Sequence, residues 1–218
     1  QLKSGNTEKA KPYFSALSSV GKKYREASIY YNAYIHYTGK QYNEAKNGFS
    51  QVKNNPEFGA NAKYYLAQIA LNDQQYGQVI QEGLQLLSEY PDHEFNSEIN
   101  RIVGESYYNE GDNNKAIEYL NRYVANTKNP LRESLYLLGI AYFNSNQPEK
   151  SIAAYKQVIG NYPGSDEAKV AIDDLKAVYL DQNDIAAYAS YLESLGGTVK
   201  YEVSELDSLA FLAAERAF

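Results

Sequence analysis

Apolar and small residues recur along the chain with the spacing of α-helices. Ile29, Ala33 and His36 fall on one helical face, and residues 135–142 repeat the arrangement. The helical segments come in pairs, because residue types that tolerate the left-handed conformation at a helix end separate the two members of each pair. These separators are Gly39-Lys40, Asn72-Asp73, Gly111-Asp112 and Asn144-Ser145-Asn146. The pattern predicts an all-α chain built from helix-turn-helix units.

The units repeat in a fixed register. A small residue recurs in the first helix of each pair at intervals of 34, 37 and 35 residues: Ala33, Ala67, Gly104 and Gly139. The second helix carries Ala45, Val79, Ala116 and Ser151, followed four residues later by Phe49, Gly83, Leu120 and Tyr155. Small residues are needed where two helix backbones approach closely, and an aromatic ring fills the space beside them. We therefore expect each glycine or alanine of this register to face an aromatic or apolar neighbour.

The fourth unit carries the clearest signature. It reads Leu135-x2-Leu138-Gly139-x2-Tyr142, then Ser151-x3-Tyr155, then Pro163. This resembles the tetratricopeptide repeat, with its W-x2-L-G-x2-Y, A-x3-F and closing Pro. Closing prolines also stand at Pro91 and, one place early, at Pro56, whereas the third unit has Pro130 two residues late, which predicts a different exit turn. The resemblance implies a right-handed α-solenoid whose stacked repeats form a concave binding surface.

The repeat register predicts that residues 1–218 form a single solenoid. The fifth unit is degenerate because Lys176 stands where the small residue belongs, and both ends match incomplete repeats, as in a segment of a longer array. The predicted ranges are a partial repeat at 1–21, repeats at 26–59, 60–96, 97–131 and 132–165, a degenerate repeat at 166–197, and a linker with the start of a further repeat at 198–218.

Composition excludes several classes of function. The chain has no cysteine, so it has no disulfide, thiol nucleophile or thiolate metal site. No run approaches the roughly 20 apolar residues of a membrane-spanning helix. Residues 1–53 carry a net charge of +6 and the remainder −12, an acidic majority that argues against nucleic-acid binding. The same asymmetry leaves self-association by end-to-end stacking open as an alternative function.

The sequence contains no recognisable combination of catalytic residues. The two histidines, His36 and His93, lie in different repeats and have no cysteine partners, so we predict no metal site. Residues 104–108 lack the second glycine of a nucleophile elbow, and residues 160–164 lack the lysine of a phosphate loop. We therefore predict a protein that is not an enzyme and has no cofactor. A regulatory or recruiting domain of a larger enzyme remains an alternative, and so does glycan binding.

The resemblance implies which residues face a partner. In tetratricopeptide proteins the first helix of each pair lines the concave groove. Here the groove would bind a protein or peptide through tyrosine rings, with Arg101 and the asparagines at its rim fixing the orientation of the partner. The alternatives are that the tyrosines pack between repeats and that the asparagines merely end the helices. The predicted groove residues are Tyr30, Tyr34, Tyr37, Tyr64, Gln68, Asn72, Arg101, Tyr108, Asn109, Tyr136, Phe143 and Asn144.

Two further features bear on partner and location. Arg101 is the only basic residue of that set, which disfavours the family's carboxylate-gripping adaptors of chaperone tails. The turns Tyr90-Pro91 and Tyr162-Pro163-Gly164-Ser165 resemble joints of bacterial cell-envelope members, of the outer-membrane assembly lipoprotein and Tol–Pal-associated coordinator types. That resemblance implies a periplasmic or envelope location, with the cytoplasm as the alternative.

Overall fold

The computed structural model describes residues 12–14, 16, 21–196 and 211. Apart from residue 211, the predicted linker and further repeat at 198–218 lie outside these residues, and so does most of the partial repeat at 1–21. The chain divides into two compact units, Gln1–Glu110 and Gly111–Phe218, and each is described by itself. The prediction of one continuous solenoid stays a prediction.

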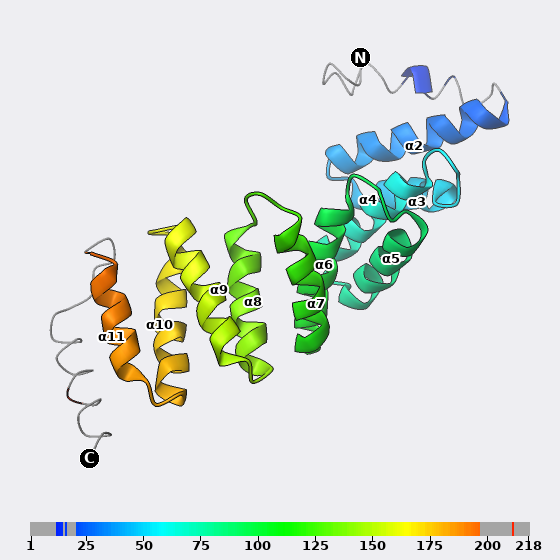
Figure 1. The fold of residues 1–218 in the computed structure, drawn as a ribbon. Helices are drawn as coiled ribbons and strands as arrows, with labels where there is room; N and C mark the ends of the chain where they lie inside the picture. Colours follow the sequence, from blue (N-terminus) through cyan, green and yellow to red (C-terminus); the bar gives the residue numbers. More distant parts are fainter. Residues whose placement is uncertain (1–11, 15, 17–20, 197–210, 212–218) are drawn as a thin grey trace. The chain divides into compact units, whose positions relative to one another are not determined.

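The described part of the first unit consists of antiparallel helices that pack on their neighbours in chain order (Figure 1). The pair α2–α3 and the pair α4–α5 fall in the first two predicted repeats, and α6 begins the third. Buried residues such as Ala45, Leu66 and Leu86 form the core between these helices. The helices are α2 (Lys22–Thr38), α3 (Tyr42–Val52), α4 (Gly59–Asn72), α5 (Tyr76–Glu89) and α6 (Asn96–Asn109).

The described part of the second unit also consists of helices that pack on their neighbours in chain order. Side chains cap several of its helices: Ser165 Oγ accepts a hydrogen bond from Ala168 N at 3.1 Å, and Asp184 Oδ1 accepts one from Ala187 N at 3.2 Å. The six residues 126–131 that join α7 to α8 outnumber the four that join α9 to α10, so the late Pro130 does accompany a longer exit turn than Pro163. The helices are α7 (Asn113–Ala125), α8 (Arg132–Asn144), α9 (Pro148–Asn161), α10 (Asp166–Asp181) and α11 (Ile185–Ser194).

Close approach of neighbouring helices explains several of the glycines that lie within helices. A Cβ added to Gly139 would lie 2.5 Å from a ring carbon of Tyr155, and one added to Gly48 would lie 2.6 Å from the Cβ of Ala33. Gly83 reverses the usual arrangement, because glycine stands where the signature has an aromatic residue, and the side chain of Val103 fills the space. The expectation that a small residue of the register faces an aromatic ring is therefore confirmed at Gly139, whose neighbour is Tyr155.

The turn within each pair places one residue in the left-handed conformation. In the first repeat that residue is Lys40, with φ 58°, and its neighbour Gly39 has φ −82°. Gln74, Asn146 and Asn183 hold the same place, and the backbone N–H of the next residue donates to a carbonyl five residues earlier, as from Gln75 to Ala70. This is the Schellman ending, which satisfies carbonyls left open by the helix.

We expect Gln74→Gly to stabilise the first unit by about 0.5–1 kcal/mol, because glycine adopts positive φ without the steric cost of a Cβ. The matched change is Gly111→Ala in the second unit, where φ is 84° and no atom stands within 4 Å of the added Cβ, so only backbone strain opposes it. That change should destabilise by a similar amount. Urea denaturation measures the change in the free energy of unfolding of both variants. A loss of stability in Gln74→Gly would contradict the left-handed conformation assigned to residue 74.

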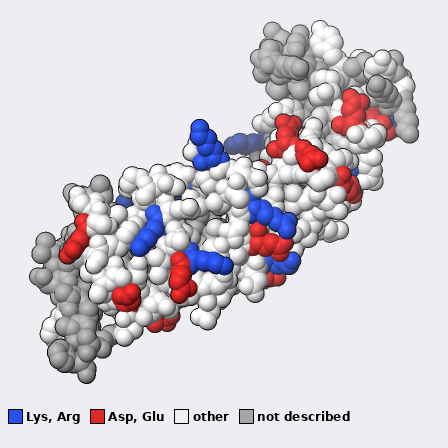
Figure 2. All heavy atoms as spheres, viewed as in Figure 1, with Lys and Arg blue, Asp and Glu red and all other residues white. Residues whose placement is uncertain are grey.

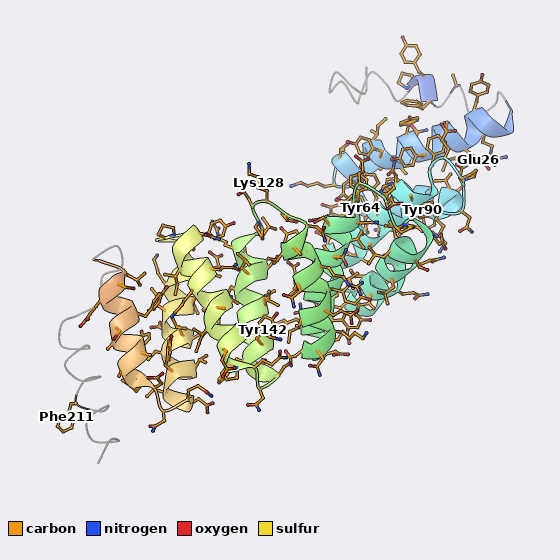
Figure 3. The ribbon with its side chains drawn as sticks, viewed as in Figure 1. Glu26, Tyr64, Tyr90, Lys128, Tyr142 and Phe211 are labelled. Carbon is orange, nitrogen blue, oxygen red and sulfur yellow. The ribbon has the colours of Figure 1, made fainter. Side chains whose placement is uncertain are left out.

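Two charged side chains are buried among the described residues of the first unit, Lys63 of α4 and Glu82 of α5. Lys63 of α4 is 1% exposed, and its ammonium is paired with the carboxylate of Glu89 and lies 5.8 Å from the centre of the Tyr90 ring. Figure 3 shows Tyr90 at the end of α5. The Lys63 charge is therefore compensated on the α5 side of α4 and is not presented on the first-helix face.

Among the described residues, no helix combines the length and apolar character that crossing a membrane requires. On the face shown in Figure 2, charged side chains lie in small groups, some mixed and some of one sign, separated by uncharged surface. That face carries no continuous basic stripe of the kind that tracks a nucleic-acid backbone.

Candidate functional site

Four tyrosines of α2 and α4 form one partly exposed group, here termed the tyrosine cluster: Tyr34, Tyr37, Tyr64 and Tyr65. The Tyr65 ring lies 5.5 Å from that of Tyr34, 4.9 Å from Tyr37 and 5.2 Å from Tyr64, measured between centroids. Tyr64 also stacks on Phe95 at 4.1 Å. The rings hold one another in place, so the exposed edges are fixed before any partner arrives.

Tyr30, predicted to line the groove, lies in the core instead. It is 7% exposed, stacks on Phe58 with 4.9 Å between ring centroids, and lies 5.8 Å from Phe49. Burial raises the pKa of its phenol to about 12. Tyr30 therefore acts as a packing wedge, the alternative that the sequence left open for these tyrosines.

Burial also affects the tyrosine cluster. It raises the pKa of Tyr65, Tyr37 and Tyr64 above the usual range for a phenol. The negative charge of Glu98 adds to the increase at Tyr37 and Tyr64. These rings are therefore neutral hydrogen-bonding groups near pH 7, and the Glu98 carboxylate acts on two of them.

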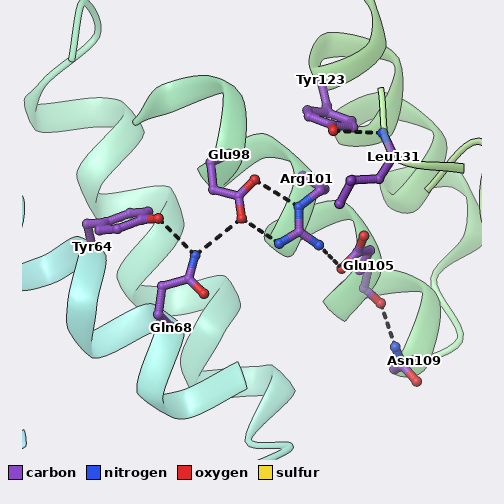
Figure 4. Close-up of polar contacts among 8 residues, drawn as sticks. All are labelled: Tyr64, Gln68, Glu98, Arg101, Glu105, Asn109, Tyr123 and Leu131. Atoms are coloured by element: carbon purple, nitrogen blue, oxygen red, sulfur yellow. Dashed lines mark hydrogen bonds and ion pairs between the residues drawn. The ribbon is translucent and has the colours of Figure 1, made fainter. Parts of the chain in front are cut away.

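A polar network joins α4 to α6 beside the tyrosine cluster (Figure 4). Gln68 Nε2 donates to the Tyr64 hydroxyl at 3.2 Å and to Glu98 Oε1 at 3.3 Å. Glu98 in turn accepts from Arg101, with 2.9 Å between Oε2 and Nε and a second bond from Nη2. Arg101 Nη1 reaches Glu105 Oε2 at 2.6 Å. The network thus runs from a tyrosine hydroxyl to an arginine held between two carboxylates.

Arg101, the residue expected to fix the orientation of a partner, has an internal role in the structure. Each of its three guanidinium nitrogens is engaged by Glu98 or Glu105, and the side chain is only 13% exposed. The two carboxylates hold the pKa of the guanidinium above its ordinary value despite burial. Two acids and one base leave the network with one net negative charge.

The three asparagines predicted at the rim stand at helix ends. Asn72, Asn109 and Asn144 are the last residues of α4, α6 and α8, and all three are exposed. Asn109 Nδ2 turns back to the Glu105 carbonyl at 2.8 Å. Their positions match the alternative that they terminate the first helices, and a role in orienting a partner stays a prediction.

The remaining predicted residues are distributed over both units. Tyr108 of α6 is partly exposed. In the second unit, the Tyr136 hydroxyl donates to Asp174 Oδ2 at 2.7 Å, which ties α8 to α10. Phe143 of α8 is 37% exposed and is the only one of these three with a large apolar surface in water. The first unit therefore carries the denser candidate site.

Sequence reasoning missed Tyr65 and Glu98. Tyr65 adjoins a predicted groove residue and was not assigned to the same face, although it contacts three of the tyrosines. Glu98 could have been found, because it lies three residues before Arg101 and Glu105 lies four after it, the spacings at which helical ion pairs form.

Neither histidine takes part in a metal-binding arrangement in the described residues. No group of three or more His, Cys, Asp or Glu residues there could hold a metal ion. His36 Nδ1 lies 2.6 Å from Gln41 Oε1, and His93 Nδ1 accepts a hydrogen bond from Phe95 N at 3.3 Å. Both imidazoles have local partners, and each stabilises a turn near its own helix end.

Comparison with known proteins supports the repeat assignment. The sequence model of the tetratricopeptide repeat family matches residues 103–126 and 133–165. A search of curated protein sequences returned no match. These two segments therefore match the tetratricopeptide repeat pattern, and the family match does not extend to the α2–α5 segment.

Solved structures share the fold along most of the chain. YrrB, described as a TPR protein with an unusual peptide-binding site, matches with a TM-score of 0.69 and 14% identity, over 94% of this chain and 97% of that one. MamA of AMB-1 matches with a TM-score of 0.67 and 14% identity, over 84% and 98%. MamA of Desulfovibrio magneticus RS-1 matches with a TM-score of 0.63 and 18% identity, over 79% of this chain and 94% of that one. At these identities the likeness establishes a tetratricopeptide α-solenoid fold.

Proposed function

We propose, from the tetratricopeptide fold and the tyrosine cluster, that the chain is a non-enzymatic scaffold that binds a protein or peptide segment. The binding surface is the first-helix face of the first unit, formed by α2, α4 and α6. The single observation that carries the proposal is that four tyrosine rings lie partly exposed on α2 and α4 while packing on one another. The peptide-binding site described for YrrB, which shares the fold, supports the same class of function.

Physical chemistry favours such a surface for peptide recognition. Tyrosine combines a large, stiff apolar area with a hydroxyl, so little conformational entropy is lost on binding. Here the rings are already fixed by their neighbours, which reduces that cost further. Hydrophobic and aromatic contacts supply the affinity, and the Tyr64 hydroxyl and the Gln68 amide orient the bound segment.

The test is selection of a displayed library of random short peptides on the purified chain. Selected peptides are then measured against a Tyr34→Ala/Tyr64→Ala variant that retains its helical circular dichroism. We expect affinity to fall by about tenfold or more, the loss usual when two aromatic anchors of an interface are truncated. The matched control is Tyr13→Ala/Tyr24→Ala, which removes two tyrosines that are 64% and 54% exposed and lie outside the cluster.

Three outcomes separate the possibilities. Loss of binding in the first variant alone supports recognition on this face. Equal binding by both variants and the parent would place the peptide elsewhere and refute the proposed site. A library that yields no binding peptide would also count against the proposal, and would favour end-to-end stacking, which sedimentation at increasing salt concentration then tests.

The proposal includes a location in the bacterial cell envelope. Its support is the likeness of the turns at Tyr90-Pro91 and Tyr162-Pro163 to those of envelope members of the family. In the second of these turns, the Tyr162 hydroxyl donates to the Pro130 carbonyl of the preceding inter-repeat turn, so the tyrosine has a structural role there. Recovery of the protein in the osmotic-shock fraction of its source cells would support the location, and recovery only with the cytosol would contradict it.

A further inference from the structure

On α4 and α6, the first-helix face of the first unit carries a group of charged side chains in which acids outnumber bases. Lys63 and Arg101 are the only Lys or Arg residues of α4 and α6, and both are already paired. Lys63 pairs with Glu89 on the far side of α4. Arg101 neutralises one of the two carboxylates beside it, so the Glu98–Arg101–Glu105 group keeps one net negative charge.

That charge is most accessible at Glu98. The Glu98 side chain is 33% exposed, against 15% for Glu105 and 13% for Arg101. The Glu98 carboxylate and the Tyr64 hydroxyl accept from the same Gln68 nitrogen, so carboxylate and ring stand side by side (Figure 4). The accessible end of the network therefore adjoins the tyrosine cluster.

An aromatic face beside a carboxylate is suited to a long cationic side chain. The methylene stem of Lys or Arg packs along tyrosine rings, and its charged head gains from the ring faces and from the carboxylate. A C-terminal carboxylate or an acidic side chain would instead meet a like charge, and no Lys or Arg of α4 or α6 remains unpaired to receive it. Charge complementarity thus selects one class of partner.

We propose that the occupant of this face is a peptide segment carrying a lysine or arginine, whose cation is placed between the tyrosine cluster and Glu98. This inference rests on the proposed function and specifies its ligand. Arg101 then has the opposite effect from a partner-gripping arginine, because it reduces the negative charge that the ligand meets.

The test begins with the peptides selected as described above. We expect them to be enriched in Lys and Arg relative to the unselected library. A selected peptide resynthesised with its lysine acetylated should bind about three- to tenfold more weakly, the size of one exposed ion pair with an aromatic contribution. The ligand-side change leaves the protein untouched, so loss of folding cannot explain it.

Two protein variants then test the site, because they are expected to change the affinity for the lysine peptide in opposite directions. Glu98→Gln keeps the shape of the side chain and should weaken binding of the lysine peptide about three- to tenfold. Arg101→Gln leaves Glu98 and Glu105 unneutralised and should tighten it. Glu44→Gln makes the same charge change at an exposed position of α3 and should alter affinity less than about twofold, because screening reduces distant charges.

The outcomes distinguish this inference from the proposed function. If peptides bind through Tyr34 and Tyr64 but are neutral or acidic, or if Glu98→Gln has no effect, the cationic ligand is refuted and the binding face remains. If Arg101→Gln weakens binding of a selected peptide while its fold is intact, Arg101 contacts the ligand and the inference is overturned. If no peptide depends on Tyr34 and Tyr64, both fail.

Discussion

Replacing Phe49 with alanine is expected to lower the free energy of unfolding by about 3–5 kcal/mol, the range for removing a buried aromatic side chain. Phe49 is fully buried, and its ring lies 5.0 Å from Tyr65, 5.8 Å from Tyr30 and 6.5 Å from Tyr37 between centroids. Because those rings come from both α2 and α4, the cavity cannot close by the movement of a single side chain. Urea denaturation followed by circular dichroism measures the loss.

The effect should be local as well as large. Repeat proteins are stabilised mainly by contacts between neighbouring repeats, so amide hydrogen exchange should accelerate in α2–α4 more than in α9–α10. Tyr24→Ala, at an exposed position of α2, is the control and should change stability by less than about 0.5 kcal/mol. A loss below about 1 kcal/mol for Phe49→Ala would contradict this packing of the rings.

Gly139→Ala is expected to destabilise the second unit by about 1–3 kcal/mol, although alanine is the better helix former. The added Cβ would lie 2.5, 2.7 and 3.1 Å from three ring carbons of Tyr155, which is 2% exposed and has no free space to enter. The backbone is also held, because Ser151 Oγ donates to the Gly139 carbonyl at 2.8 Å. The clash therefore outweighs the gain in helix propensity.

Gly160→Ala is the matched control in the same unit. Gly160 lies in α9 with nothing within 4 Å of an added Cβ, so the change should stabilise by about 0.5–1 kcal/mol. Thermal unfolding of both variants thus compares two identical substitutions of opposite expected sign. Adding Tyr155→Leu to Gly139→Ala should cost less than the sum of the single changes, since the smaller side chain relieves the clash. Additive losses would show that the two residues do not interact.

The close approach of Gly139 to Tyr155 was predictable from sequence, because a small residue and an aromatic recur in a fixed register and sterics leave few ways to pack them. The helix ends at Asn72, Asn109 and Asn144 follow from turn chemistry. Local sequence patterns of this kind therefore predict most of the fold.

The site was less predictable, because it depends on which side of a helix faces which neighbour. Tyr30 and Tyr34 are one helical turn apart, yet one is a core wedge and the other partly exposed. The left-handed position falls on Lys40 rather than Gly39, because the hydrogen bonding of the helix end fixes the place and steric preference only adjusts its cost. Arg101 resembles a partner-binding residue when it is taken alone, whereas acids at helical spacing on both sides of it satisfy its charge within α6.

The tyrosine cluster has a spectroscopic consequence. The chain contains 23 tyrosines and no tryptophan, and the Tyr65 ring lies within 5.5 Å of the other three rings of the cluster, between centroids. Excitation absorbed by one such ring passes readily to the next, so the group acts as a single antenna. A bound peptide with one tryptophan would collect that energy and emit at longer wavelength, which makes the unlabelled protein its own reporter of occupancy.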